Sequence, residues 1–460
     1  MLDWRLLWLL IIVAAFRPSE ASPKLDPFGR SIQVAPIFPY YRDRSAESIV
    51  SEIAASGYRC VRLAVELDST DPKLVEEFHK AGIAVWYTTF GNGTYSPGVL
   101  PAGCEKWRMK LRLNQPDKVA AGFVYLCMND PEYREWKKKQ VVATLKRIPF
   151  DGIEVCESFW PAFRGPESPT YGCLCENCRD AFLRMYPDES DIPEFSDPSD
   201  PNYYATNRAL YEKWIEFRVR SSASFVDDII NGPGGVRAEC PRVKVGVWGI
   251  ADAMPDAVAR MREWEGIDGP LIVKTVHPDL YVLQTDWPDW SNPDLAPDYP
   301  LKYKPFVDAI RAASKVTIIM QADVGSFENC RRGTDWMAKC ESAARKAGMG
   351  GITSYEYHLT RDIYEAPPRL VSARGSGKTI TLTFTKRLDA EKASDTSNYS
   401  LDSGRLLSAQ ADGNLVKLEV SGHPRKITVR NLPDDPSRRL FAGYPAVAMK
   451  GEESLPVNWQ

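Results

Sequence analysis

The sequence predicts an α/β protein, a (β/α)8 barrel of the TIM type followed by a small all-β sandwich of the immunoglobulin-like type. Between residues 31 and 358, short β-branched and aromatic runs alternate about eight times with amphipathic helical patterns, as in parallel βα units. After Pro368 the pattern changes to alternating apolar and polar residues separated by turn residues. With 460 residues, 44% of them hydrophobic, the chain is long enough for one large core and a smaller second one. We expect the barrel in residues 22–365, and the sandwich with a C-terminal tail in residues 366–460.

Each expected strand is a short apolar or β-branched run bounded by turn or polar residues. In chain order these runs are Ser31–Phe38, Tyr58–Ala64, Ile83–Thr89, Gly152–Glu157, Val243–Trp248, Leu280–Thr285, Val316–Gln321 and Gly351–Glu356. Between the second and third runs, Asp71 can cap a helix that begins at Pro72 and ends at Gly82. A longer amphipathic helix is expected from about Leu210 to Gly232.

The first 21 residues have the pattern of an export signal. Leu6 to Phe16 form an apolar run behind Arg5, and Ser19-Glu20-Ala21 offers small residues where a signal peptidase reads. The run is short for a membrane span, and no second apolar stretch of that length follows. We therefore expect a protein that begins at Ser22, has no membrane span in its mature form, and is secreted, periplasmic or at the cell surface. The alternative is that the apolar run is retained as an N-terminal anchor.

Charge and histidine content narrow the function classes. The 58 basic and 61 acidic residues are interspersed, so the sequence shows no electrostatic footprint for a nucleic acid. Only four histidines are present, which directs attention to carboxylates for acid-base chemistry. The sequence does not predict an oligomeric state.

In a (β/α)8 barrel the reacting groups lie at the carboxyl ends of the strands and in the loops that follow them. Carboxylates and aromatic residues dominate there. The side chains at these ends are Tyr40, Tyr41, Glu66, Asn92, Glu157, Trp248, Asp286, Trp287, Gln321, Asp323, Glu356 and His358. The connections from Phe90 to about Glu132 and from Ser158 to about Thr206 also follow strands, and their unusual length indicates function.

Paired carboxylates surrounded by aromatic residues suit the hydrolysis of glycosides. One carboxylic acid protonates the leaving oxygen, and a second carboxylate is the nucleophile or activates water. Glu157 is the first candidate because it ends the apolar run Gly152–Cys156. Glu356 and Asp286 are nearly equal candidates for the second carboxylate, and Asp323 is a third. Glu154 lies deeper in the strand and is expected to pair with a cation such as Arg62. The predicted sugar-binding residues are Trp160, Trp248, Trp287, Tyr41, Glu66, Asn92, Gln321 and His358.

Three cysteines lie within six residues, at Cys173, Cys175 and Cys178. This spacing favours convergence on one tetrahedral metal ion, since disulfides between such close cysteines would be strained. The alternative is disulfide pairing after export, with Cys60, Cys104, Cys127 or Cys240 as partners. A redox or catalytic metal site is a further alternative.

Around residues 120–230 the chain resembles family 42 glycoside hydrolases, β-galactosidase-like barrels. The resemblance rests on Cys156-Glu157-Ser158, on the C-x-C-x2-C motif with the following "RDAFLRMYP", and on "YEKWIEFRVRSSASFVDDI". It implies that Glu157 is the acid/base. It also implies that Cys127, in "VYLCMNDPEYREW", joins Cys173, Cys175 and Cys178 around a structural zinc.

The chain departs from that family at two positions. Cys156 stands where the family has asparagine, and the seventh strand has no glutamate where the family's nucleophile stands. The barrel also resembles a broader group of glycosyl-hydrolase-like barrels with "DGI" in the fourth strand, in which carboxylates after strands 4 and 6 form the expected pair. Asp151-Gly152-Ile153 and Asp286 match that pattern.

The sequence therefore predicts an exported glycoside hydrolase that acts on a poly- or oligosaccharide, with no catalytic cofactor and a structural zinc. The alternative is a non-catalytic carbohydrate-binding surface protein on a degenerate barrel. The segment from Pro367 to Leu401 resembles bacterial Ig-like modules, whose expected roles are spacing, packing on the barrel or surface attachment.

Overall fold

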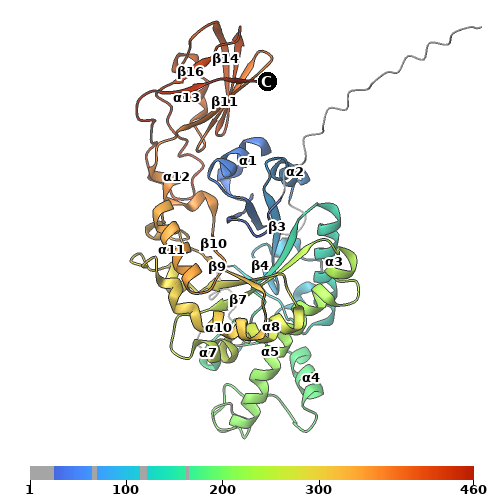
Figure 1. Ribbon diagram of the computed structural model, residues 1–460. Coiled ribbons are helices and arrows are strands. Elements are labelled where there is room, and N and C mark those ends of the chain that lie inside the picture. The colour runs from blue at the N-terminus through green and yellow to red at the C-terminus, as the bar shows by residue number, and fades with distance from the viewer. Residues whose placement is uncertain (1–24, 65–69, 114–121, 162–164) are drawn as a thin grey trace, which may run out of the picture.

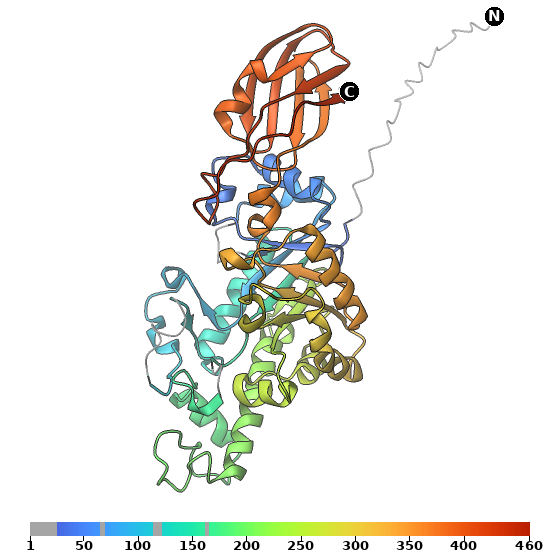
Figure 2. The same ribbon diagram turned by 90° about the vertical axis from the view of Figure 1, so that its left-hand side faces the viewer.

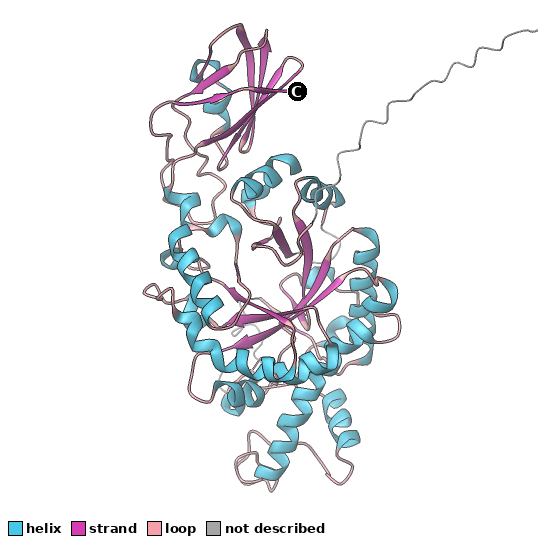
Figure 3. Ribbon diagram, in the orientation of Figure 1, coloured by secondary structure: helices cyan, strands magenta, loops and turns pink. Residues whose placement is uncertain are grey.

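The computed structural model describes residues 25–64, 70–113, 122–161 and 165–460. The predicted export signal and Glu66 lie outside these residues. Figure 1 shows a barrel with helices around it and a separate β domain, and Figure 3 shows the helices outside the strands. Among the described residues, no helix has both the length and the apolar content needed to cross a membrane.

Within the described residues, eight parallel strands form one sheet in the order β1-β2-β3-β6-β7-β8-β9-β10. Their bounds are Ser31–Val34, Cys60–Ala64, Ala84–Phe90, Gly152–Cys156, Lys244–Ala251, Leu280–Thr285, Thr317–Ala322 and Ile352–Ser354. The first strand also lies against the last, so the sheet is nearly closed. The (β/α)8 prediction is confirmed. The expected first strand continued to Phe38, but β1 ends at Val34, before Pro36 and Pro39.

The helices pack around this sheet. Their bounds are α1 Ala46–Ala55, α2 Pro72–Lys80, α3 Pro131–Arg147, α4 Glu176–Met185, α5 Arg208–Asn231, α6 Val236–Glu239, α7 Ala257–Glu265, α8 Gly269–Val276, α9 Trp287–Trp290, α10 Lys304–Ala313, α11 Thr334–Lys346 and α12 Arg361–Glu365. The start of α2 is capped as expected, since the Asp71 side chain accepts a hydrogen bond of 3.0 Å from the Lys73 amide. Gly82, directly after the helix, has a φ of 74°, which glycine adopts at little cost.

The inside of the barrel contains both apolar and charged side chains. Cys60, Trp86, Trp248, Leu280 and Ile319 belong to one buried cluster. Arg62 and Glu154 form an ion pair there, as predicted, and both side chains are almost fully buried. A charged pair in such surroundings needs its partner, because an unpaired buried charge is very costly. This pair therefore belongs to the structure of the barrel.

The two long connections after β3 and β6 lie on the same side of the barrel (Figure 2). The first contains the short strands β4 (Gly93–Thr94) and β5 (Val124–Tyr125), which pair in antiparallel fashion. The second leads into α4 and then α5, which project beyond the barrel (Figure 1). Both connections therefore bring distant parts of the sequence to the carboxyl ends of the strands.

The β domain follows α12 and has its own core. In residues 366–460, all of which the structure describes, one sheet has the order β14-β15-β12-β11-β18 and the other β13-β16-β17. The bounds are β11 Leu370–Ser376, β12 Thr379–Phe384, α13 Ala390–Ser394, β13 Tyr399–Leu401, β14 Arg405–Asp412, β15 Leu415–Ser421, β16 Lys426–Val429, β17 Glu453–Pro456 and β18 Asn458–Trp459. Alternate residues of β12, such as Ile380 and Leu382, point into this core. The extra all-β domain is present as expected.

Candidate active site

A cavity of about 650 Å³ opens at the carboxyl ends of the barrel strands. This is the end at which TIM barrels hold their active sites. The side chains around it come from nearly every strand end and from the β domain: Gln33, Ala35, Pro36, Ile37, Phe38, Ala64, Thr88, Phe90, Tyr95, Ser96, Cys156, Glu157, Trp248, Gln284, Trp290, Gln321, Asp323, Ser326, Tyr355, Leu359 and Leu440.

Glu157 lies in this cavity, directly after β6. Its backbone has a φ of 51°, a left-handed conformation that costs a non-glycine residue energy. Gln284, near the end of β8, donates a hydrogen bond of 3.1 Å to Glu157 Oε1. Burial raises the pKa of Glu157 to about 7, the bond from Gln284 opposes this rise, and the nearby charges of Asp323 and Asp286 add to it. A large fraction of Glu157 is therefore protonated at neutral pH.

Two aspartates stand beside Glu157. Asp323 follows β9 and lines the cavity, and the Gln321 side chain donates a hydrogen bond to it. Asp286 follows β8 and caps α9 by accepting a 2.7 Å hydrogen bond from the Trp287 amide. Burial raises the pKa of each aspartate to about 6. Both are therefore mostly ionised at neutral pH, unlike Glu157.

Glu356 occupies a different environment. It is fully buried and is not among the side chains that line the cavity. Its carboxylate accepts hydrogen bonds from the Ala35 amide (2.7 Å), the Tyr41 hydroxyl (2.8 Å) and the Tyr357 amide (2.9 Å). These contacts bind the β10 end to the loop after β1. A carboxylate enclosed in this way positions a loop and does not face a substrate.

The predicted aromatic residues divide into three groups. Trp248 lines the cavity, together with Trp290. Trp287 is 51% exposed and lies outside the lining, at the start of α9. Trp160 is fully buried, and its indole donates a 3.1 Å hydrogen bond to the Arg218 carbonyl. Trp160 therefore offers no face on which a sugar can stack.

Of the other predicted sugar-binding residues, Gln321 lines the cavity. Tyr41 and His358 are buried around Glu356, with His358 Nδ1 3.7 Å from the carboxylate. Asn92 is also buried. Its amide donates to the Phe159 carbonyl (2.8 Å) and its carbonyl oxygen accepts from the Phe159 amide (3.1 Å). Asn92 thus fixes the loop that follows Glu157.

Sequence reasoning missed several lining residues. Gln284 is a polar residue inside an apolar strand, Leu280–Thr285, two positions before Asp286. That position at the carboxyl end of a strand was the signal that could have identified it. Tyr95 and Tyr355 lie in segments after strands and resemble many other loop tyrosines. Leu440 lies in the β domain, and no local pattern relates it to the barrel.

Cys127, Cys173, Cys175 and Cys178 converge away from the cavity, with all four sulfur atoms within 4.8 Å of one another. The Cys127 sulfur is 3.5 Å from those of Cys175 and Cys178. Sulfur atoms bound to one tetrahedral zinc ion lie about 3.8 Å apart, so the four fit such an ion closely. None of the ten cysteines, all of which lie in the described residues, forms a disulfide bond.

The surroundings of the cysteines also suit a metal. The Asn129 side chain donates a 3.3 Å hydrogen bond to the Cys178 sulfur, as outer groups of metal sites commonly do. Cys127 precedes α3, and Cys175 directly precedes α4. The cluster therefore joins the connection after β3 to the connection after β6. Four protein ligands close a tetrahedral site and leave no open position for catalysis.

Comparison with known proteins identifies the fold. No family profile and no curated protein sequence matches the chain. Among solved structures, the glycoside hydrolase domain of PgaB (BpsB) from Bordetella bronchiseptica matches with a TM-score of 0.51 and 14% identity, over 72% of this chain and 94% of that domain. This likeness shows the TIM-barrel fold.

Two β-galactosidases give weaker matches. A catalytic mutant of Gan42B, a GH42 β-galactosidase from G. stearothermophilus, has a TM-score of 0.49 and 15% identity, over 73% of this chain and 52% of that one. The enzyme from the haloarchaeon Halorubrum lacusprofundi has a TM-score of 0.46 and 16% identity, over 71% and 52%. The chain spans about half the length of each. These structural neighbours are all glycoside hydrolases.

Proposed function

We propose that the protein is a glycoside hydrolase that uses Glu157 as its general acid. The observation that carries the proposal is the position of a carboxyl group with a pKa of about 7 in the cavity, beside a carboxylate with a pKa of about 6. Carboxyl groups whose surroundings separate their pKa values divide the acid and base roles between them. The PgaB glycoside hydrolase domain, which shares the barrel fold, agrees with this reaction class.

In this mechanism the neutral Glu157 donates its proton to the glycosidic oxygen as the bond to the leaving group breaks. Asp323, ionised at the same pH, is the partner that attacks the sugar or activates water. Gln284 holds one Glu157 oxygen and orients the carboxyl group. Trp248 and Trp290 offer apolar faces for sugar rings. We prefer Asp323 to Asp286 because Asp323 lines the cavity, whereas Asp286 caps α9.

The geometry favours an active barrel over a degenerate one. Asp323 directly follows β9, the seventh strand of the barrel, so a carboxylate stands near the place where the expected glutamate is missing. Glu157 combines a left-handed backbone with a buried carboxyl group, and each of these has a cost in stability. A barrel that only binds sugars has no need of such a residue.

The test is the release of reducing sugar from a panel of plant and microbial poly- and oligosaccharides. We expect Glu157→Gln and Asp323→Asn each to lower release by at least about two orders of magnitude. Glu328→Gln, which changes an exposed glutamate on the segment after β9, is the matched control and should keep wild-type activity. Wild-type release that survives Glu157→Gln would overturn the assignment of Glu157. Binding to the panel without release would establish the non-catalytic sugar-binding alternative.

We further propose that Cys127, Cys173, Cys175 and Cys178 hold a structural zinc ion. The support is the closeness of the four sulfur atoms and the hydrogen bond from Asn129 to Cys178. Zinc would fix the two long connections relative to each other and take no part in bond cleavage. We also propose that the protein is exported, on the basis of the apolar run from Leu6 to Phe16.

A further inference from the structure

The β domain reaches the cavity through one side chain, Leu440. Leu440 lies between β16 and β17, more than 70 residues beyond the last barrel element, α12, and yet lines the cavity. Its side chain is 44% exposed. Because the side chain lines the cavity, part of its surface can contact a molecule that enters the cavity.

The segment that carries Leu440 is held firmly against the barrel. Phe441 packs beside Tyr364 of α12, and the Phe441 amide donates a 3.3 Å hydrogen bond to the Tyr364 hydroxyl. The Arg331 guanidinium lies over Tyr364 at 4.0 Å and over Tyr444 at 4.3 Å, and the two rings also contact each other edge to face at 5.1 Å. These contacts flank Leu440 closely in sequence and fix its position at the cavity.

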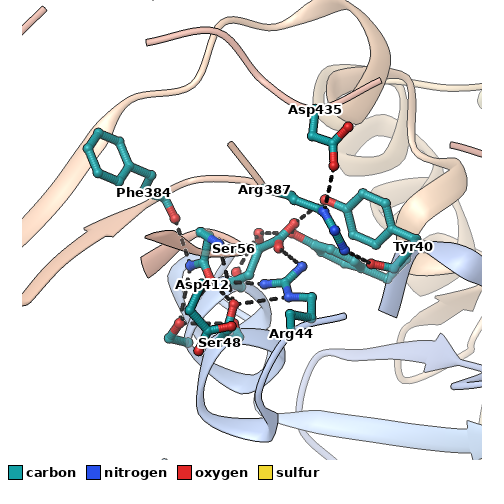
Figure 4. A network of polar contacts seen from close by, with 12 residues as sticks. Tyr40, Arg44, Ser48, Ser56, Phe384, Arg387, Asp412 and Asp435 are labelled. Atoms are coloured by element: carbon teal, nitrogen blue, oxygen red, sulfur yellow. Dashed lines mark hydrogen bonds and ion pairs between the residues drawn. The ribbon is translucent and has the colours of Figure 1, made fainter. Parts of the chain in front are cut away.

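A second contact of the β domain holds the loop after β1, which also lines the cavity. Arg387 of the β domain donates hydrogen bonds to the carbonyl oxygens of Tyr40 (3.2 Å) and Arg42 (2.7 Å) and pairs with Asp435 at 2.9 Å (Figure 4). The bonded carbonyls directly follow the loop that supplies Ile37 and Phe38 to the cavity. The β domain thus supports the loop after β1 as well as contributing Leu440.

These residues give the cavity two chemically different sides. Ile37 and Phe38 follow β1, Leu359 follows β10, and these strands are neighbours in the barrel. Leu440 is held against α12, which follows Leu359 closely. The proposed acid Glu157 comes instead from the end of β6, across the barrel, whereas Gln284 of β8 and Asp323 after β9 lie between the two. An aliphatic side therefore lies opposite Glu157.

We infer that the β domain is part of the substrate site and that Leu440 selects substrates with an apolar group, such as an alkyl or acyl substituent or an apolar aglycone. The inference rests on the proposed function, because it places the sugar bond at Glu157 and the apolar group against Ile37, Leu359 and Leu440. Aliphatic side chains gain from covering apolar surface but offer nothing to sugar hydroxyl groups.

The test compares methyl and hexyl glycosides of the common hexoses, in both anomers and below the concentration at which micelles form. Each pair has the same sugar and differs only in the apolar aglycone. For the wild type we expect a KM at least about tenfold lower for the hexyl glycoside, since several methylene groups are buried. We expect Leu440→Ala to raise the KM for the hexyl glycoside about threefold to tenfold, with kcat and the KM for the methyl glycoside unchanged.

Two further variants separate contact from structure. Leu440→Met keeps an apolar side chain of similar volume and should restore most of the lost affinity. Leu407→Ala removes an exposed leucine of β14, outside the cavity lining, and should behave as the wild type. Equal KM values for the two glycosides, or equal effects of Leu440→Ala and Leu407→Ala, would overturn the inference.

The outcome is independent of whether hydrolysis occurs. The polysaccharide panel alone decides the proposed function. If the wild type cleaves none of the alkyl glycosides, calorimetric binding of the same pairs to Glu157→Gln measures the preference. Tighter binding of the hexyl glycoside that Leu440→Ala abolishes would then support the inference without the enzyme activity. Binding of neither glycoside would overturn the inference and leave the proposed function to the polysaccharide panel.

Discussion

At the scale of the residue, the site contains two carboxyl groups of similar chemistry that differ in pKa. Burial raises the pKa of Glu157 to about 7 and that of Asp323 to about 6. The acid form of Glu157 and the ionised form of Asp323 coexist mainly between these two values. The proposed mechanism needs both forms at once.

The pH dependence of kcat/KM should therefore be bell-shaped, with a maximum between about 6 and 7. As pH falls below about 6, Asp323 takes up a proton and ceases to act as nucleophile or base. As pH rises above about 7, Glu157 loses the proton it donates. The measurement is initial rates from pH 4 to 9. Activity that keeps rising up to pH 9 would contradict the role of Glu157 as an acid.

Asp286 provides the control for this profile. Its pKa is also raised to about 6, so a single acidic limb does not by itself identify Asp323. Asp286→Asn should retain a bell-shaped profile with reduced activity, whereas Asp323→Asn should abolish activity across the range. The reverse result would transfer the partner role to Asp286.

Some of these residues were predictable from sequence and others were not. Glu157 stands at the end of a clear apolar run, and position alone places it at the active end of a barrel. Glu356 has the same position at another strand and looked equally suitable. Its carboxylate accepts hydrogen bonds from the Ala35 amide, 321 residues away in the chain, and from the Tyr41 hydroxyl. No local pattern reports a contact over that distance.

At the scale of the element, the four-cysteine cluster links the long connections after β3 and β6, which lie outside the barrel sheet. Cys127 stands before α3, whose start Asp130 caps, and Cys175 directly precedes α4. Asn177 of α4 donates a 2.8 Å hydrogen bond to the Asp130 side chain. The starts of α3 and α4 are thus linked by sulfur atoms and by a hydrogen bond.

If zinc occupies this cluster, elemental analysis should find one zinc ion per chain. Strong chelators, or Cys178→Ser, should lower the free energy of unfolding by about 3 kcal/mol or more, because metal binding contributes directly to folding. Thermal and denaturant unfolding measure the change. Cys240→Ser, a partly exposed cysteine outside the cluster, is the control and should have little effect. Zinc-free protein with unchanged stability in Cys178→Ser would rule the proposal out.

The strands of the barrel and the helices α2 and α5 were predictable because each carries its own signal. Alternating runs located all eight strands, and Asp71, Pro72 and Gly82 marked the ends of α2. The connections carry weaker signals. The pairing of β4 with β5 joins Gly93 to Tyr125, across a long stretch with no hairpin motif. The length of these connections indicated a functional role, but it did not indicate how they fold.

At the scale of the whole molecule, the β domain and the barrel share a continuous polar interface. Asn414, in the turn before β15, is fully buried against α1. Its carbonyl oxygen accepts hydrogen bonds from Arg44 (2.9 Å) and Ser48 (3.0 Å), and its amide donates to the Phe384 carbonyl (3.0 Å). The sequence presents Asn414 as an ordinary turn residue. Only the assembled interface shows that it is buried.

We expect Arg387→Ala to uncouple the two domains. The substitution removes two hydrogen bonds to barrel carbonyl groups and an ion pair that is mostly buried, at a cost of about 2–4 kcal/mol. Calorimetry should then resolve two unfolding transitions where the wild type shows one. Arg374→Ala, on the exposed side of β11, is the matched control and should leave the single transition in place. A single transition at the wild-type temperature in Arg387→Ala would show that this contact does not couple the domains.

The interface also determines where the gene can be cut and rejoined. A chimaera with its breakpoint near Ala366 would follow the apparent domain boundary, but it would separate Asn414 from Arg44 and Arg387 from the Tyr40 carbonyl. The unit that can be exchanged between related chains is therefore discontinuous. It consists of the C-terminal β domain together with residues 35–55, the loop and helix of the barrel on which that domain rests.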